Sequence, residues 1–169
     1  MRKSYFFLVL LTIVCACKKP GSSTRKCAPE KKEYIYESGR QLNIQKVALN
    51  DTAFDHYSYT INSGDKEVFT FTYQFTDCPD VADDEGARII LFEIPGGLSS
   101  FKLKDSADLR NAKVLINYAC FCVPSGPVLT HVGTIEGEKQ NGRWHVKASV
   151  KISPAYLNTI DFEADFTKK

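Results

Sequence analysis

The sequence predicts an all-β domain, and three observations lead to this fold class. Apolar and polar residues alternate in many short runs, which is typical of half-buried strands. Glycine, proline and asparagine separate these runs, as they do at turns. Only one short stretch has the spacing of a helical turn. About nine strands without an internal repeat favour an antiparallel, two-sheet immunoglobulin-like sandwich, with a small lipocalin-like β-barrel as the alternative.

The first predicted strands lie in the first half of the chain. In residues 42–49 the phase of the alternation changes at Gln45–Lys46, which predicts a bulge or a break. Residues 57–61 place two tyrosines and an isoleucine on one face of the next strand. Asn62–Asp65 then predicts a turn, and residues 69–75 alternate as a clear half-buried strand.

The middle of the chain predicts a central strand. Ala87–Ile94 is apolar on both faces and is stopped by Pro95–Gly97. Residues 101–104 alternate again, and residues 105–111 predict one helical turn. In the long strand predicted over 114–122, the apolar side chains and both cysteines share one face.

The C-terminal third predicts a hairpin with a fixed register. Asn141–Gly142 lies between two alternating runs, and both residues tolerate the positive φ of a two-residue turn. Such a turn pairs Gln140 with Arg143. The inner side chains of the second strand, which begin with Trp144, then lie opposite small residues of the first strand. The last alternating run, residues 160–166, predicts a further strand.

The composition fits one neutral folded domain. Of the 169 residues, 43% are hydrophobic and 12% are aromatic, which is a globular composition. There are 22 basic and 20 acidic residues. Two of the basic ones, Arg2 and Lys3, lie among the first sixteen residues, so the remainder carries 20 of each sign. Without a basic excess we expect no nucleic-acid partner.

The first seventeen residues have the layout of a secretory signal. Arg2 and Lys3 give a positive start, and Tyr5–Val14 is an apolar run too short to span a bilayer. The small residue Ala16 precedes Cys17. This segment resembles the lipobox of bacterial lipoproteins, in which cleavage falls just before a cysteine that carries lipid. The resemblance implies lipid attachment at Cys17.

The same resemblance divides the chain into three parts and suggests where it resides. A signal peptide covers residues 1–16, the lipidated cysteine and a flexible tether cover 17–32, and a single β-domain covers 33–169. The implied partner is a membrane, held through the N-terminal lipid. No acidic residue follows Cys17 until Glu30. By the same resemblance we expect a cell-envelope protein on the outer membrane, facing the periplasm.

Four cysteines besides the lipid acceptor remain for disulfides: Cys27, Cys78, Cys120 and Cys122. An exported protein reaches an oxidising compartment, which favours disulfide bonds. Cys120 and Cys122 are two residues apart in a strand, and this geometry strains a bond between them. We therefore expect each of them to bond one of Cys27 and Cys78, with no free thiol left.

A metal site is the alternative use of these cysteines. Two thiolates of Cys120 and Cys122 with the imidazole of His131 would suit copper or zinc. The hairpin register, however, places His131 on the inward face, where a lone histidine is usually a core residue. The acidic loop 77–85 lacks the spacing of an EF-hand. We therefore expect no metal ion and no cofactor.

The sequence carries no signature of catalysis. It lacks G-x-S-x-G, H-E-x-x-H and a glycine-rich phosphate loop. His56, His131 and His145 lie on separate predicted strands. The C-terminal pattern also resembles the hairpin of small Gram-negative lipoproteins of unknown function, which implies no activity. We expect a membrane-anchored, non-catalytic lipoprotein whose β-domain binds or supports an unknown ligand or envelope protein. The alternative is an exported metal-handling domain.

Overall fold

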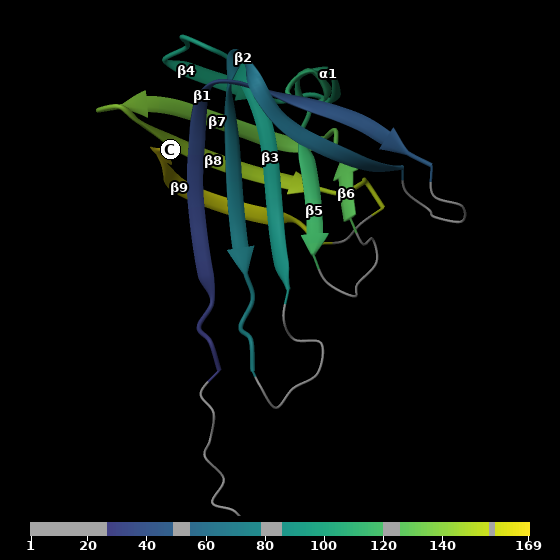
Figure 1. Ribbon diagram of the computed structural model, residues 1–169. Coiled ribbons are helices and arrows are strands. Elements are labelled where there is room, and N and C mark those ends of the chain that lie inside the picture. Colours follow the sequence, from purple (N-terminus) through teal and green to yellow (C-terminus); the bar gives the residue numbers. More distant parts are fainter. Residues whose placement is uncertain (1–26, 49–54, 79–85, 120–125, 156–157) are drawn as a thin grey trace, which may run out of the picture.

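The computed structural model describes residues 27–48, 55–78, 86–119, 126–155 and 158–169 (Figure 1). Its elements in chain order are β1 (Lys31–Val47), β2 (His56–Gln74), β3 (Ala87–Pro95), β4 (Ser100–Leu103), α1 (Ser106–Asn111), β5 (Leu115–Ala119), β6 (Gly126–Leu129), β7 (Val132–Gln140), β8 (Arg143–Lys151) and β9 (Ile160–Lys168).

The described strands form one nine-stranded mixed sheet, which confirms the all-β class. Their order across the sheet is β4-β7-β8-β9-β1-β2-β3-β5-β6. Every neighbouring pair is antiparallel except β1 and β9, which run parallel. This parallel pair is short, with Ile35 opposite Thr167 and Tyr36 opposite Lys168. In Figure 1, β7, β8 and β9 cross β1, β2 and β3 at a steep angle.

The main core lies between these two crossing parts of the sheet. Phe69 of β2 stacks on Phe92 of β3 with ring centroids 4.6 Å apart, and the edge of Trp144 from β8 meets Phe69 at 5.7 Å. Phe71 contacts Phe162 of β9 at 4.6 Å. Large apolar side chains from both parts are thus removed from water together, which is the main stabilising contribution to the fold.

The long β1–β2 hairpin bends near its middle. Its register shifts between Ser38 and Gln41, where Gly39 has a φ of +70°, which glycine adopts without strain. The turn expected at Asn62–Asp65 is wrong, because these residues form the matching irregularity inside the continuous strand β2. The break expected at Gln45–Lys46 is wrong as well, since the register is continuous there.

Beyond this bend, the outer half of the hairpin covers the second face of the sheet. Leu42 of β1 is buried there against Val68, Leu91 and Leu115 of β2, β3 and β5. Around them lie partly buried apolar side chains: Ile44, Tyr57, Tyr59, Ile61, Ile89 and Leu129. The strand β3 is therefore covered on both faces, as its apolar sequence predicts.

The C-terminal hairpin and the helical turn agree with the sequence. Asn141 and Gly142 have φ of +51° and +78°, and Gln140 pairs with Arg143 as expected. The helix α1 begins after Asp105, whose side chain accepts hydrogen bonds from the first-turn amides of Ala107 and Asp108.

The described sheet begins earlier than expected. β1 starts at Lys31, and Ala28 already forms a β-bridge with Asp77. The domain boundary predicted at residue 33 therefore lies inside β1. Ala28, Lys31 and Lys32, which we expected in the tether, are therefore paired with residues of the 73–77 segment.

Candidate functional site

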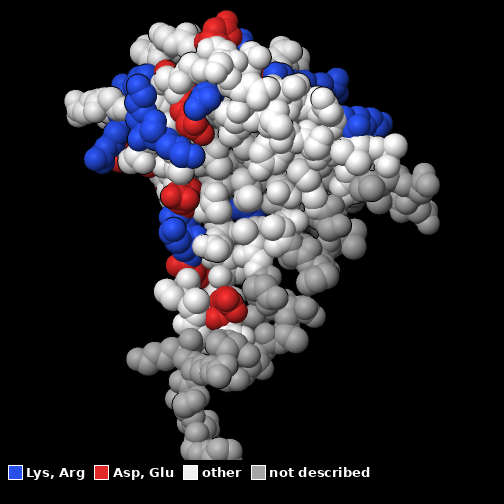
Figure 2. Space-filling view, in the orientation of Figure 1, with Lys and Arg blue, Asp and Glu red and all other residues white. Residues whose placement is uncertain are grey.

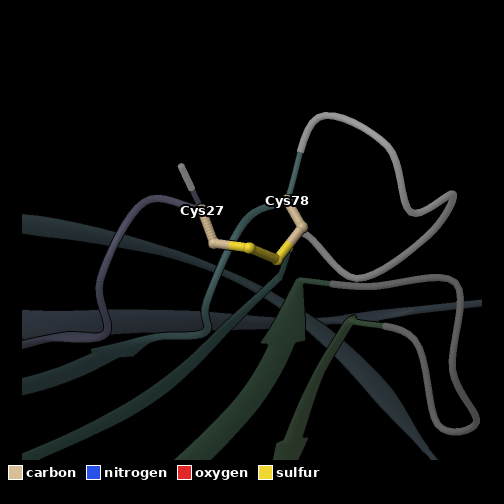
Figure 3. The surroundings of a disulfide bond; sticks show 2 residues. All are labelled: Cys27 and Cys78. Atoms are coloured by element: carbon tan, nitrogen blue, oxygen red, sulfur yellow. A yellow bond between two sulfur atoms is a disulfide. The ribbon is translucent and has the colours of Figure 1, made fainter. Parts of the chain in front are cut away.

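A disulfide joins Cys27 to Cys78, with Cα atoms 4.1 Å apart (Figure 3). The two cysteines lie four residues beyond the paired residues Lys31 and Gln74, in the same antiparallel register. Because β1 and β2 lie side by side up to this point, the extended ends bring the two sulfur atoms together. The bond fixes the beginning of the described chain to the end of β2.

This bond corrects the expected connectivity. We expected Cys27 and Cys78 each to bond a cysteine of the 120–122 segment, and this pairing is wrong because they bond each other. Cys120 and Cys122 lie outside the described residues, and so does the lipid acceptor Cys17.

The structure does not gather the three histidines into one site. His56 of β2 is buried, and its Nδ1 finds no hydrogen-bond partner in the described ranges of the chain. His131 is exposed just before β7 begins, so the expected inward orientation is wrong: the strand that would direct it inward starts one residue later. Among the described residues, no three His, Cys, Asp or Glu side chains are placed to hold a metal ion.

His145 lies between two carboxylates on the outer face of β8 and β9. Its Nδ1 is 2.8 Å from Oδ1 of Asp165, and its Nε2 is 3.3 Å from Oε1 of Glu163. Hydrogen bonding to Asp165, and then to Glu163, raises the pKa of His145 above its ordinary 6.5. Hydrogen bonds from His145 and Lys147 lower the pKa of Glu163. This cluster borders a shallow groove between β4 and β9, lined by both signs of charge.

A second feature is a row of cations and aromatic rings across four strands. Lys32 of β1 is paired with Tyr73 of β2, Tyr73 with Arg88 of β3, and Arg88 with Tyr118 of β5. The ammonium of Lys32 lies 5.4 Å from the ring centre of Tyr73. The guanidinium carbon of Arg88 lies 5.0 Å from the ring centre of Tyr118 and 5.9 Å from that of Phe75. Cations over aromatic faces at such distances are attracted to them.

Two buried glutamates hold the upper part of the fold together. Glu67 accepts from Trp144 Nε1 at 2.5 Å and from Lys139 Nζ at 3.0 Å. On the other face of the sheet, Glu93 meets Lys113 Nζ at 2.9 Å. Each carboxylate is thus occupied by partners within the domain, which suits a structural role.

Sequence reasoning missed Arg88, Glu67 and Glu93 as important positions. The signal was present, because Arg88 and Glu93 are charged residues in a run that is otherwise apolar on both faces. A charge in such a run has to meet a partner or a ring on one of the covered faces. Which partner it meets depends on strand pairing, and the sequence does not give that pairing.

The face of the molecule in Figure 2 carries charges of both signs rather than one dominant sign. Figure 2 shows lysine, arginine and acidic side chains together along the β1 side, next to a broad area with few charges. No protein family, no curated protein and no solved structure matches this chain. Within the described part of the chain, no helix has the length and apolar character needed to cross a membrane.

Proposed function

We propose that this protein is an exported lipoprotein of the bacterial envelope, anchored through lipid on Cys17 and carrying a non-catalytic β-domain that binds or supports another envelope component. The Cys27–Cys78 disulfide is the observation that carries the proposal. Such bonds persist in oxidising compartments and are rare in the cytosol. A disulfide next to a signal-type N-terminus therefore supports export.

The anchor suits the position of this disulfide. Nine residues lie between Cys17 and Cys27, and the ten steps from one cysteine to the other, at about 3.3–3.6 Å each, reach at most about 36 Å. Each buried methylene contributes about 0.8 kcal/mol to membrane binding, and several acyl chains on one cysteine make attachment effectively permanent. The domain would be held close to the membrane surface by the end that carries Cys27. We place this anchor on the outer membrane, facing the periplasm.

The finer fold proposed is a two-sheet sandwich of immunoglobulin-like type. Its support is the main core, which lies between β7–β9 on one side and β1–β3 with β5 on the other. A closed lipocalin-like barrel would need the outermost strands β4 and β6 to pair. No such pairing occurs among the residues described.

Cell fractionation tests the anchor. Cys17→Ser should move the protein from the membrane fraction to the soluble fraction or leave it unprocessed, because the acyl acceptor is lost. Cys15→Ser is the matched control and should leave the protein membrane-bound. A wild-type protein found soluble, with a free N-terminus at Cys17, would contradict the proposal. Loss of the protein to protease added outside intact cells would contradict the periplasmic orientation.

Metal handling by Cys120, Cys122 and His131 is the second candidate. One observation favours it: Cys27 and Cys78 bond each other, so the 120–122 cysteines lose the partners we expected for them. Thiolates that are not in disulfides suit copper or zinc. Metal analysis of the purified protein, before and after reduction, tests this candidate. A metal-free protein in both states would eliminate it.

A further inference from the structure

Arg88 of β3 is a cation that forms no ion pair with any residue that the structure describes. Its Nε is buried and has no hydrogen-bond partner among the described residues. The two lysines that lie against the core differ in this respect. Lys113 reaches the buried Glu93, and Lys139 reaches the buried Glu67. Within the part of the chain that the structure describes, the donors of Arg88 are therefore not committed to an ion-pair partner.

The rings of Tyr118 and Phe75 fix this guanidinium instead. Its carbon lies 5.0 and 5.9 Å from their centres. The residue is half-buried, which leaves part of its side chain open to solvent. A planar guanidinium held against rings loses less freedom when it binds, and its fork of donors matches the oxygen atoms of a phosphate. The site therefore fits a phosphate-bearing anion.

The rest of the row adds to this chemistry. Lys32 supplies a second cation, two strands from Arg88, and the tyrosines lie between and beside the two cations. Glu30, which precedes β1, forms a hydrogen bond with the hydroxyl of Tyr73. Tyrosine with lysine and arginine is the combination found where proteins meet a membrane surface. A lipid headgroup is thus the source of phosphate that the row fits.

The position of the row in the molecule points to the same source. Lys32 is five residues from Cys27, so the row lies at the end of the sheet where the Cys27–Cys78 bond fixes the chain. In Figure 1 the lower ends of β1, β2 and β3 extend beyond β9 at this end. A chain anchored at Cys17 would therefore present this end to the headgroups.

We propose that Lys32, Tyr73, Arg88 and Tyr118 form a binding site for the phosphodiester of an anionic membrane lipid, with Arg88 as the main phosphate ligand. The proposal rests on the lipid anchor for the nearness of the membrane. The site itself is a property of the folded domain. Bound headgroups would orient the domain on the membrane, in addition to the lipid that holds it there.

A titration of the purified, detergent-extracted protein tests the site. The probes are dihexanoyl phosphatidylglycerol, which is soluble and carries the phosphodiester, dihexanoyl phosphatidylcholine, which carries no net charge, and inorganic phosphate. Binding is followed by amide chemical shifts. The wild type should bind phosphatidylglycerol more tightly than either other probe, and added salt should weaken this binding.

Substitutions at Arg88 give the decisive comparison. Arg88→Gln should weaken phosphatidylglycerol binding at least tenfold, and Arg88→Lys should weaken it less, because the charge remains but the planar fork is lost. Arg143→Gln, at an exposed arginine of β8, is the matched control and should bind as the wild type does. Thermal unfolding of each variant verifies that it is folded.

Each outcome bears on the proposal. Absence of binding by the wild type, or equal binding by Arg88→Gln and the wild type, would overturn it. Inorganic phosphate that binds as tightly as phosphatidylglycerol would overturn the membrane source. A soluble, unlipidated wild type that still binds phosphatidylglycerol through Arg88 would refute the proposed anchor and support the site.

Discussion

The indole Nε1–H of Trp144 donates to Oε2 of Glu67 at 2.5 Å, across 77 residues of sequence and between the two crossing parts of the sheet. Oε1 of the same carboxylate accepts from Lys139 at 3.0 Å. The ammonium of Lys139 also lies 5.4 Å from the Trp144 ring. One buried carboxylate thus connects β2 with both strands of the C-terminal hairpin.

Removing the indole donor should destabilise the protein. Trp144→Phe keeps an aromatic ring but leaves one oxygen of the buried Glu67 without its donor. We expect the free energy of unfolding to fall by about 1–3 kcal/mol. Urea denaturation measures this change. Glu138→Gln, on the outer face of the same hairpin, is the control and should alter stability by no more than about 0.5 kcal/mol. Equal effects of the two substitutions would contradict the role of this hydrogen bond.

A second buried glutamate holds the bent β1–β2 hairpin to the sheet. Glu93 Oε2 accepts from the amide of Leu42 at 2.6 Å, while Lys113 Nζ donates to the carbonyl of Leu42 at 2.6 Å. Lys113→Met should leave Glu93 buried without its counter-charge, at a cost of about 3–5 kcal/mol. Lys104→Met is the exposed control. In the Lys113→Met variant, the amide of Leu42 should also exchange hydrogen faster. Unchanged exchange there would show that the lysine does not hold this strand.

Breaking the disulfide should weaken the end of the domain that carries it. The double substitution Cys27→Ser and Cys78→Ser removes a cross-link between residues that are 51 apart in sequence. A disulfide that closes such a loop contributes about 2–4 kcal/mol to the free energy of unfolding. Urea denaturation of the double variant measures the loss, and the reduced wild type should show a similar one. Mass mapping under non-reducing conditions should recover a Cys27–Cys78 cross-linked peptide. A peptide that links either cysteine to Cys120 or Cys122 would refute the connectivity.

The His145 cluster should make a small, pH-dependent contribution to stability. The raised pKa of His145 gives stabilisation that is complete below about pH 6.5 and is lost as pH rises through the folded-state pKa. The lowered pKa of Glu163 gives stabilisation that is present above about pH 4.5 and is lost as pH falls through its folded-state pKa. Between these limits both contributions are complete. Because the groups are exposed, solvent screens the interaction.

Comparison of wild type with His145→Gln tests this pH dependence. The difference in melting temperature should be largest near pH 5–6 and should shrink toward pH 8. The exposed His131→Gln serves as the control. A constant difference across this range would mean that the charge of His145 does not contribute.

The sequence predicted the parts of the fold that local rules determine. Alternation identified the strands, and Asn141–Gly142 fixed the register of β7 and β8, because a two-residue turn allows only one pairing. The apolar run Ala87–Ile94 marked the strand that is covered on both faces. Each of these inferences needs only neighbours in sequence.

The errors arose where the answer depends on which strands pair. Asn62–Asp65 has turn residues, but the chain continues through them as a bulge, so β1 and β2 pair along one long hairpin. That pairing brings Cys27 beside Cys78, and a turn at Asn62–Asp65 would not have placed them so. The Arg88 row was missed for the same reason, since its members come from four strands. Such contacts follow from topology rather than from local pattern.

Under the export proposed above, the short parallel contact between β1 and β9 has a consequence for how the chain acquires its structure. The main core combines Tyr36, near the start of the sheet, with Phe162 and Phe166 of β9, the last strand described. The amide of Lys169 donates to the carbonyl of Tyr36 at 3.0 Å. A chain that crosses a membrane from its N-terminus therefore cannot complete this core until β9 has emerged. Contacts between residues so far apart in sequence slow folding, so the β1–β2 hairpin should remain partly formed until β9 pairs with β1.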